Sequence, residues 1–591
     1  MLNILVDTVR ISGFRGIKNL EMTLPRVTVL IGTNNSGKTS LLKALQLALG
    51  DYSRYISEED FFIGSDEKRV NEINVDVRFV PVDNNGNRVA VFDDVWLTDF
   101  GDKIKAEANG NQFMALRTRV KPNDIKGGFE CTRFAMQTWP EFAVWLDEKP
   151  KEKDKINKII STPFISIEAQ RDIHYELKDK SSFAGKVLSG VEYQKEDIIE
   201  IEKLINDLNL SAIEKSEALK NFKTHLEQLN QSFQGAGNVE ITPFPKKIRD
   251  LSKHFSVHFG ENANGVFSME YHGMGTRSWA SMLTVKAFIE SAAAKHEEEV
   301  EPFFPILAAE EPEAHLHPNA QKTLYQQLAD TKGQVIVSTH SPYFAAMADI
   351  MDIRSLRKDA TGITAMRLTK DYTAEEKKIL SREITSKRGE ILFARALILC
   401  EGITEEQIIP AFFDICSDKS FFSLGLCCIN VGGKNYPPFI KLACSLGIPT
   451  FIVSDNDGDT KTTVEAQIAK IKTDHGLGLG TDIFGVSYLA AGNDFEAELM
   501  SIALLRDEII TAVVLSETNA TINAQYKAAK LTEVSALNDV DLIARMRGTK
   551  SSYSGFLADV VRENPNGKAP ETITPAAITA ALTQIKTWLV V

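Results

Sequence analysis

The chain has 591 residues, of which 43% are hydrophobic and 25% charged, which is the length of three or four domains and the composition of a globular protein. No apolar run is long enough to span a bilayer and the N-terminus lacks a signal-peptide pattern, so we expect a cytoplasmic protein with no membrane partner. The formal net charge of −13 argues against a broadly basic nucleic-acid-binding surface, although a local basic groove is compatible with it.

In chain order, the first element with a predicted chemical role follows an apolar, β-branched strand at 27–31. The turn at 32–39 reads GTNNSGKT and fits the pattern GxxxxGK(S/T), and a helical repeat follows at 40–49. In that context backbone N–H groups surround phosphates, Lys38 reaches the β- and γ-phosphates, and Thr39 holds Mg²⁺. The predicted ATP-binding residues of this loop are Gly32, Asn34, Asn35, Ser36, Gly37, Lys38 and Thr39.

The segments after this loop are predicted to form strands and then long helices. Residues 70–145 alternate strand-like runs with turns, whereas 197–233 contain no Pro or Gly and repeat apolar residues at helical spacing. We expect one or two amphipathic helices there, broken near Asn209, within an insert over about 175–262. Such helices can form an arm or a dimer contact, or pack as a solvated hairpin on their own domain.

Two further strand ends supply candidate partners for the nucleotide. An apolar strand at 305–309 ends in Glu310 and Glu311, a carboxylate pair suited to binding Mg²⁺ and polarising the attacking water. A second strand at 335–339 leads to His340, which can contact the γ-phosphate when the other two elements are present.

Acidic residues at two strand ends dominate the second half of the chain. The polar, helix-prone segment 373–395 predicts a linker, and the apolar strand after it, 396–400, runs into Glu401. Another strand at 450–454 ends in Asp455 and Asp457. Ligand sites in open α/β sheets lie at the carboxyl edge, and carboxylates at i and i+2 can converge on one hard cation.

The ATP-binding half resembles the ABC ATPases of the RecF, SMC and OLD (overcoming lysogenization defect) group. The segments that carry the resemblance are FRGI at 14–17, the loop at 32–39, EEPEAHLHP at 310–318 and STHS at 338–341. The resemblance implies a Walker B residue at Glu310, a catalytic glutamate at Glu311, a D-loop at 315–317 and a switch histidine at His340. Glu310 stands where these ATPases usually have Asp, and we expect slower hydrolysis from that departure.

ABC ATPases also need a signature segment from a second subunit. The segment 272–278, HGMGTRS, precedes a predicted helix at 279–292 and resembles the degenerate signature of this group. Gly275 would then bind the nucleotide of the partner subunit, whereas the alternative is a plain helix cap. Gln170 is the candidate for the Q-loop.

The acidic strand ends together resemble the TOPRIM domain of OLD nucleases, primases and topoisomerases. NVGGK at 430–434 and NDFEAEL at 493–499 resemble the OLD subgroup in particular, and the layout is also similar to that of the Gabija nuclease subunit. The implied fold class is α/β, with an ABC-type ATPase domain that carries an inserted helical arm, a TOPRIM α/β domain and a helical C-terminal region. The expected boundaries are 1–372 for the ATPase domain, 373–395 for the linker helix, 396–510 for the TOPRIM domain and 511–591 for the helical region.

The resemblance implies a DNA endonuclease that nicks or cuts both strands by two-metal phosphodiester hydrolysis with Mg²⁺ or Mn²⁺, in addition to the Mg²⁺ held with ATP. The first ion would be bound by Glu401, Asp455 and Asp457, and the second by Glu405 with Asp494 or Glu496. Lys550, in the segment RGTKSS, is the candidate cation beside the scissile phosphate, and a plain surface lysine is the alternative.

The family resemblance also implies partners and control. We expect a homo-oligomer, a dimer or a dimer of dimers, assembled through the ATPase half, with DNA as substrate and a helicase or retron-type partner in anti-phage defence. In the related Gabija nucleases high nucleotide is thought to restrain cutting, so we expect ATP to act as a sensed inhibitor of this nuclease. Slow hydrolysis at the Walker B site suits such a sensor. The linker at 373–395 would couple the two sites.

The sequence leaves two alternatives to this function, of which the first is a TOPRIM topoisomerase or primase. A topoisomerase would need a nucleophilic tyrosine, for which Tyr553 is the only residue after Tyr526, and a primase would need a zinc module, which six cysteines without CxxC spacing do not supply. An SMC- or RecF-like ATP-driven DNA clamp with a non-cleaving TOPRIM domain is the non-enzymatic alternative.

Overall fold

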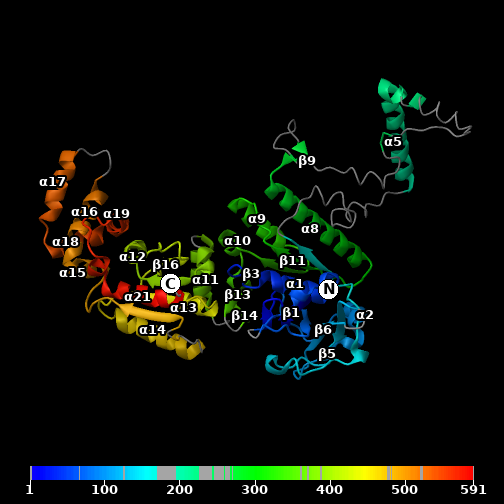
Figure 1. Ribbon diagram of the computed structural model, residues 1–591, viewed down its shortest axis with the longest axis horizontal. Coiled ribbons are helices and arrows are strands. Elements are labelled where there is room, and N and C mark those ends of the chain that lie inside the picture. Colours follow the sequence, from blue (N-terminus) through cyan, green and yellow to red (C-terminus); the bar gives the residue numbers. More distant parts are fainter. Residues whose placement is uncertain are drawn as a thin grey trace, which may run out of the picture.

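The fold was derived from a computed structural model of the whole chain (Figure 1). The structure describes residues 3–64, 67–123, 127–168, 195–221, 223–224, 243–244, 258–259, 267–268, 271–359, 362–368, 372–386, 389–475, 480, 482–518 and 524–589. Gln170, the Q-loop candidate, and most of the predicted insert at 175–262 lie outside these residues.

A six-stranded, mostly parallel sheet carries the nucleotide loop. Its order is β14-β13-β3-β12-β11-β8, and only β14 runs antiparallel to its neighbour. The strands are β3 (Val27–Ile31), β8 (Phe164–Ile167), β11 (Ile306–Glu310), β12 (Gln334–Ser338), β13 (Ile353–Asp359) and β14 (Gly362–Arg367). The central strands are continuous runs of apolar residues because both faces of a parallel sheet are covered.

A second, antiparallel sheet packs on the same domain, with helix α1 (Lys38–Leu49) beside it. Its order is β2-β1-β4-β6-β5, with β7 paired to β6. The strands are β1 (Asn3–Phe14), β2 (Ile17–Thr23), β4 (Ile73–Val82), β5 (Lys105–Ala106), β6 (Gln112–Pro122) and β7 (Phe129–Ala135), and the short helix α2 (Leu97–Phe100) borders them. Apolar residues of α1 share one core with β1, β4 and one face of the parallel sheet, so α1 is held between the two sheets.

Helices α8 (Met274–Glu298), α9 (Pro318–Ala329) and α10 (Pro342–Ala345) cover the other face of the parallel sheet (Figure 1). Val27, Val29 and Ile31 of β3 pack in one core with Met282 and Val285 of α8, as the period of two along a strand requires. Helix α8 corresponds to the helix predicted at 279–292, but it begins five residues earlier, at Met274.

The second half of the chain contains a four-stranded parallel sheet with the order β16-β15-β17-β18. The elements are β15 (Ala396–Cys400), α12 (Ile403–Ile415), β16 (Leu426–Asn430), α13 (Tyr436–Ser445), β17 (Thr450–Ser454), α14 (Thr460–His475) and β18 (Phe484–Tyr488). The two strands that end in acidic residues, β15 and β17, are therefore direct neighbours.

The C-terminal helices share a core with this sheet. They are α15 (Phe495–Ser501), α16 (Arg506–Glu517), α17 (Ala524–Ser535), α18 (Asp539–Gly548), α19 (Lys550–Glu563), α20 (Pro570–Ile573) and α21 (Ala576–Leu589). Tyr553 and Leu557 of α19 lie in one buried cluster with Ile408 and Phe412 of α12. The helical region is thus packed against this four-stranded sheet.

The predicted linker consists of α11 (Ala374–Ser386) and a 3-10 helix, η10 (Gly389–Phe393), which lie between the two parallel sheets (Figure 1). Leu380, Ile384 and Ile391 are buried in a core cluster that reaches from β3 to β17, so the linker joins two halves that share apolar packing. A Cβ on Gly389 would stand 2.2 Å from the carbonyl oxygen of Pro342, so the linker also touches α10.

One predicted helix break was wrong. Helix α5 (Lys195–Lys215) runs through Asn209, and the interruption comes at Ser216. The side chain of Asn209 is buried and bonds both the N–H and the carbonyl of Phe244, so a polar residue in mid-helix marks a tertiary contact. A two-stranded ladder of β9 (His258–Phe259) and β10 (Phe267–Ser268) lies in the same region of the chain. Within the described residues no helix is both long and apolar enough to cross a bilayer.

Candidate functional site

The phosphate-binding loop at 32–37 joins β3 to α1 in a conformation that requires glycine. A Cβ on Gly32 would lie 2.4 Å from the carbonyl oxygen of Leu356, and both Gly32 and Asn35 have positive φ angles of 149° and 63°. The Nζ atom of Lys38 donates to the carbonyls of Gly32 at 2.9 Å and Thr33 at 3.0 Å, so the amine points back into the loop. Burial lowers the pKa of Lys38, while nearby glutamates oppose that shift.

The two glutamates at the end of β11 face different partners. Thr39 Oγ1 donates a hydrogen bond to Glu310 Oε1, so the two residues predicted to hold Mg²⁺ lie together despite the longer side chain at the Walker B position. Glu311 has a positive φ of 43°, and its Oε1 lies 3.4 Å from His340 Nε2. Burial, and secondarily the charge of Lys38, lowers the pKa of His340. The ends of β11 and β12 therefore lie beside Thr39 and Lys38 at the start of α1.

A third glutamate, Glu313, supports the turn that carries His340. Its Oε1 accepts hydrogen bonds from Thr339 Oγ1 at 2.5 Å, His340 N at 3.1 Å and Ser341 N at 3.3 Å. Burial raises the pKa of this carboxyl, while the three hydrogen bonds oppose the shift. Sequence reasoning assigned no role to Glu313, although its place in the EEPE run was the available signal.

The predicted signature residue Gly275 lies inside the first turn of α8. A Cβ there would stand 2.4 Å from the carbonyl oxygen of His315, in the segment predicted to be the D-loop. The two segments thus pack against each other in one chain, and the absence of a side chain at Gly275 permits that approach. The contact of Gly275 with a partner's nucleotide stays a prediction.

The carboxylates of the second half meet at the carboxyl edge of the parallel sheet. Glu401 follows β15, Asp455 follows β17, and Glu401 Oε1 accepts hydrogen bonds from Ser454 Oγ at 2.8 Å and Asp455 N at 3.3 Å. Glu405 projects from the first turn of α12 and is buried. Asp457 Oδ1 accepts a bond from Thr460 Oγ1 at 2.7 Å. The structure therefore brings together residues that are up to 56 positions apart in the chain, from Glu401 to Asp457.

These four carboxylates carry more negative charge than their surroundings neutralise. Burial, with the charges of Glu405, Glu401 and Asp457, raises the pKa of Asp455 to about 8. Burial, followed by the charges of Glu496 and Glu401, raises the pKa of Glu405 to about 7. A divalent cation would relieve both effects, so the donor set and its electrostatics fit a hard metal ion.

The four carboxylates are not arranged as a ready-made metal site. Among the residues that the structure describes, no three His, Cys, Asp or Glu side chains are grouped closely enough to hold one ion as they stand. Carboxylate side chains would therefore have to rotate towards a bound ion.

The later acidic segment lies at the same edge but is held by basic residues. Asp494 caps α15 through a bond from Ala497 N to Oδ1 at 3.0 Å, and its Oδ2 accepts from Arg547 Nε at 2.8 Å. Glu496 is fully buried, and its Oε2 lies 2.9 Å from Lys550 Nζ. Lys550 is the first residue of α19. Arg547 was missed, although it stands three residues before Lys550.

Tyr553 is unsuited to act as a DNA-attacking nucleophile in this conformation. Its side chain is fully buried, and its hydroxyl donates to Glu496 Oε1 at 3.4 Å. Thr404 Oγ1 bonds the same oxygen at 3.1 Å. A tyrosine that forms a covalent link to a phosphodiester has to reach the solvent-exposed strand, so this placement argues against a topoisomerase.

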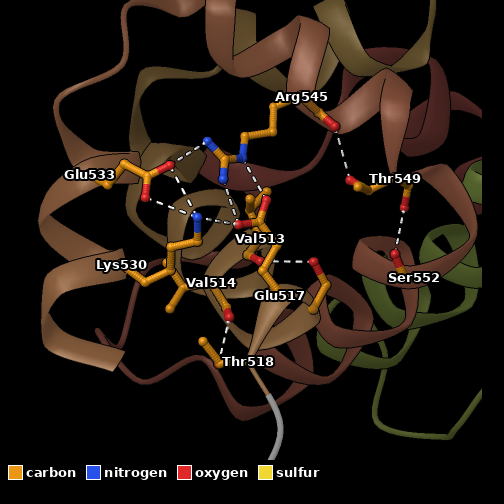
Figure 2. A network of polar contacts seen from close by, with 10 residues as sticks. Val513, Val514, Glu517, Thr518, Lys530, Glu533, Arg545, Thr549 and Ser552 are labelled. Carbon is orange, nitrogen blue, oxygen red and sulfur yellow. Dashed lines mark hydrogen bonds and ion pairs between the residues drawn. The ribbon is translucent and has the colours of Figure 1, made fainter. Parts of the chain in front are cut away.

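A network of charged side chains anchors α18, the helix that carries Arg547. Figure 2 shows Arg545 of α18 between Glu517 of α16 and Glu533 of α17, with Lys530 beside both glutamates. The Nη2 atom of Arg545 lies 2.6 Å from Glu517 Oε2, and Thr549 Oγ1 donates to the Arg545 carbonyl at 2.9 Å (Figure 2). These ion pairs lower the pKa of Glu517 and raise that of Arg545. The last turn of α18 is thereby tied to two neighbouring helices.

Comparison with known families finds one matching family model in each half of the chain. The AAA ATPase domain family matches residues 5–345, and the TOPRIM domain of proteins like the overcoming lysogenization defect protein matches residues 392–457.

Individual relatives extend over most of the chain. The Old nuclease of Escherichia phage P2 is 23% identical over 488 residues, which cover 77% of this chain and 78% of that protein. Endonuclease GajA of Bacillus cereus strain VD045 is 22% identical over 467 residues, covering 77% and 75%. A solved structure, the C-terminal region of the Burkholderia pseudomallei OLD protein, is 24% identical and covers 33% of this chain and 99% of that chain, with a TM-score of 0.25.

Proposed function

Because this chain belongs to the AAA ATPase domain family and carries an OLD-like TOPRIM domain, we propose that it is an ATP-binding, metal-dependent DNA endonuclease. We assign the ATPase domain to residues 1–372, the linker to 373–395, the TOPRIM domain to 396–510 and its helical C-terminal part to 511–591. The relatives named as nucleases support the activity.

The observation that carries this proposal is the group of carboxylates at the ends of β15 and β17. Glu401, Asp455 and Asp457 would hold one Mg²⁺ or Mn²⁺ ion, and Glu405 with Asp494 or Glu496 a second. Ions bound there would activate water and stabilise the leaving oxygen of a phosphodiester. Lys550 is half-exposed beside this edge, where its ammonium can meet a DNA phosphate.

We propose that the ATPase half of one chain supplies one side of the nucleotide site, which the signature segment of a second subunit completes. Lys38 and Thr39 would bind phosphate and Mg²⁺ together with Glu310, while Glu311 and His340 would orient water and the γ-phosphate. The hydroxyl of Ser36 is buried without a hydrogen-bond partner in the described chain, and a phosphate oxygen would supply one.

A plasmid assay tests the activity. Supercoiled plasmid is incubated with wild type and with Glu401→Gln or Asp455→Asn in Mg²⁺ or Mn²⁺, with EDTA as the metal-free control. We expect wild type to nick or linearise the plasmid and both variants to lose cleavage by about two orders of magnitude or more, because each removes a charged ligand of the metal. The control variant Glu465→Gln changes an exposed carboxylate of α14 and should cut as wild type does.

The same assay distinguishes a nuclease from the main alternative, a DNA clamp that does not cleave. A protein that binds DNA without cutting it in any metal, and whose carboxylate variants bind equally well, would be an ATP-driven DNA clamp. Cleavage by Glu401→Gln at the wild-type rate would place the nuclease site elsewhere.

We also propose that cleavage serves defence against phage, alone or with a helicase or retron-type partner. The resemblance to OLD and Gabija nucleases supports this role. Phage plaque counts on cells that express wild type or Glu401→Gln test it, and equal counts would contradict it.

A further inference from the structure

Basic residues divide the acidic edge of the nuclease sheet into two groups of carboxylates. Glu401, Glu405, Asp455 and Asp457 form no ion pair with a basic side chain within the described residues. Asp494 and Glu496 are each paired, with Arg547 and Lys550 respectively. The first group can accept a cation directly, whereas the second has to exchange an existing positive partner for it.

Asp494 is engaged at both oxygens in this conformation. Oδ1 caps α15 and Oδ2 accepts from Arg547, whose side chain is 49% exposed and therefore borders solvent. Arg547 thus stands in for a missing positive charge at the only oxygen of Asp494 that does not cap a helix.

The backbone that carries Arg547 is fixed by contacts on its other side. Arg545, two residues earlier, is bound to Glu517 and Glu533, and Thr549 bonds the Arg545 carbonyl (Figure 2). Rotation of the long Arg547 side chain is therefore possible without movement of α18.

We propose that Arg547 is an internal counter-ion that leaves Asp494 when a divalent cation binds there and then contacts a phosphate of the DNA substrate. The inference rests on the proposed nuclease function and adds to it a residue that contacts the DNA. Arginine suits the second task because its planar guanidinium bonds phosphate oxygens in pairs. Binding of the second metal ion and binding of DNA are thereby coupled through the side chain of Arg547.

The test uses the full-length protein and two readouts other than cleavage. Mn²⁺ binding without DNA is titrated by electron paramagnetic resonance in wild type, Arg547→Gln and Arg547→Lys. DNA binding is measured in Ca²⁺ at several salt concentrations. We expect Arg547→Gln to bind the weaker Mn²⁺ ion about fivefold or more tightly, since a competing cation is removed. It should bind DNA more weakly, with a salt dependence lower by about one phosphate contact.

The matched control is Arg562→Gln, which removes an arginine of α19 that pairs with Asp414 at 2.9 Å away from the acidic edge. It should leave both Mn²⁺ affinities unchanged, and Arg547→Lys should retain wild-type Mn²⁺ binding because the charge is kept. If Arg547→Gln binds Mn²⁺ no better than wild type, the counter-ion role is overturned while the nuclease proposal stands. A wild type that binds no Mn²⁺ overturns both.

Discussion

At the residue scale, the two adjacent glutamates of the nucleotide site have separate contacts and should have separate roles. Glu310 contacts Thr39, and Glu311 faces His340. We expect Glu311→Gln to slow ATP hydrolysis by about 100-fold or more, the usual effect of losing a general base, while ATP still binds. Phosphate release and nucleotide binding measure the two effects. Glu298→Gln, an exposed change on α8, serves as the control, and wild-type hydrolysis by Glu311→Gln would remove Glu311 from the catalytic role.

Because the carboxylates of the nuclease edge have raised pKa values, we expect the stability of the folded protein to depend on pH and on bound metal. The pKa of Asp455 in the folded protein, about 8, lies above its unfolded value of roughly 3.9. Its contribution to stability is therefore complete at low pH and is lost as the pH rises through 8. In EDTA we expect the melting temperature to fall as the pH rises from about 4 to about 8, and Mg²⁺ to oppose the fall.

The variant Asp455→Asn isolates this effect, because an amide does not titrate. Its melting temperature should change less over the same range, as measured by differential scanning calorimetry. If the melting temperature of Asp455→Asn changed with pH as steeply as that of wild type, Asp455 would not be the cause of the pH dependence.

At the element scale, α18 connects the helical tail to the acidic edge. Arg545 binds the helix to α16 and α17 (Figure 2), and Arg547 reaches Asp494. We expect Arg545→Gln to raise hydrogen exchange in α17 and α18 and to reduce cleavage by as much as about 100-fold, since an ångström of misplacement is enough for such a loss. Glu533→Gln removes a more exposed partner and should have a much smaller effect. Equal activity of Arg545→Gln and wild type would show that the network stabilises the tail alone.

At the scale of the whole molecule, the linker offers a route between the two sites. His340 is followed by α10, whose Pro342 carbonyl touches Gly389, and η10 leads into β15 and Glu401. We expect millimolar ATP to restrain DNA cutting by wild type, and binding of DNA and ATP to weaken each other equally. Lys38→Ala should cut at the same rate at every ATP concentration.

Gly389→Ala tests the contact itself, because its Cβ would stand 2.2 Å from the Pro342 oxygen and force the two elements apart. It should bind ATP normally yet lose much of the ATP response in the plasmid assay. A response equal to that of wild type would place the coupling elsewhere.

Self-association is the second prediction at this scale. Helix α5 exposes Ile199, Leu204, Leu208 and Leu210, each more than half exposed, and the predicted signature segment requires a second subunit. We expect a dimer or larger species at micromolar concentration by light scattering, and Leu204→Glu with Leu208→Glu to shift it towards monomer. Leu531→Glu on α17 is the control, and a monomeric wild type with and without ATP would contradict the prediction.

Local patterns in the sequence were sufficient to predict the fold class, and they nominated the candidate site residues. The turn at 32–39 needs glycine for its backbone path, and apolar strands that end in acidic residues define sheet edges, so both parallel sheets could be expected before the structure. The family resemblance that rests on those motifs is confirmed by the AAA ATPase and TOPRIM matches.

Tertiary structure alone decided which charges meet. That β15 and β17 are neighbours, that Glu313 holds the His340 turn and that Arg547 pairs with Asp494 depend on strand order and helix packing, which spacing along the chain does not encode. The start of α8 at Met274 and the unbroken α5 were missed for the same reason. Burial and long-range partners at Gly275 and Asn209 overrode the local preferences of glycine and asparagine.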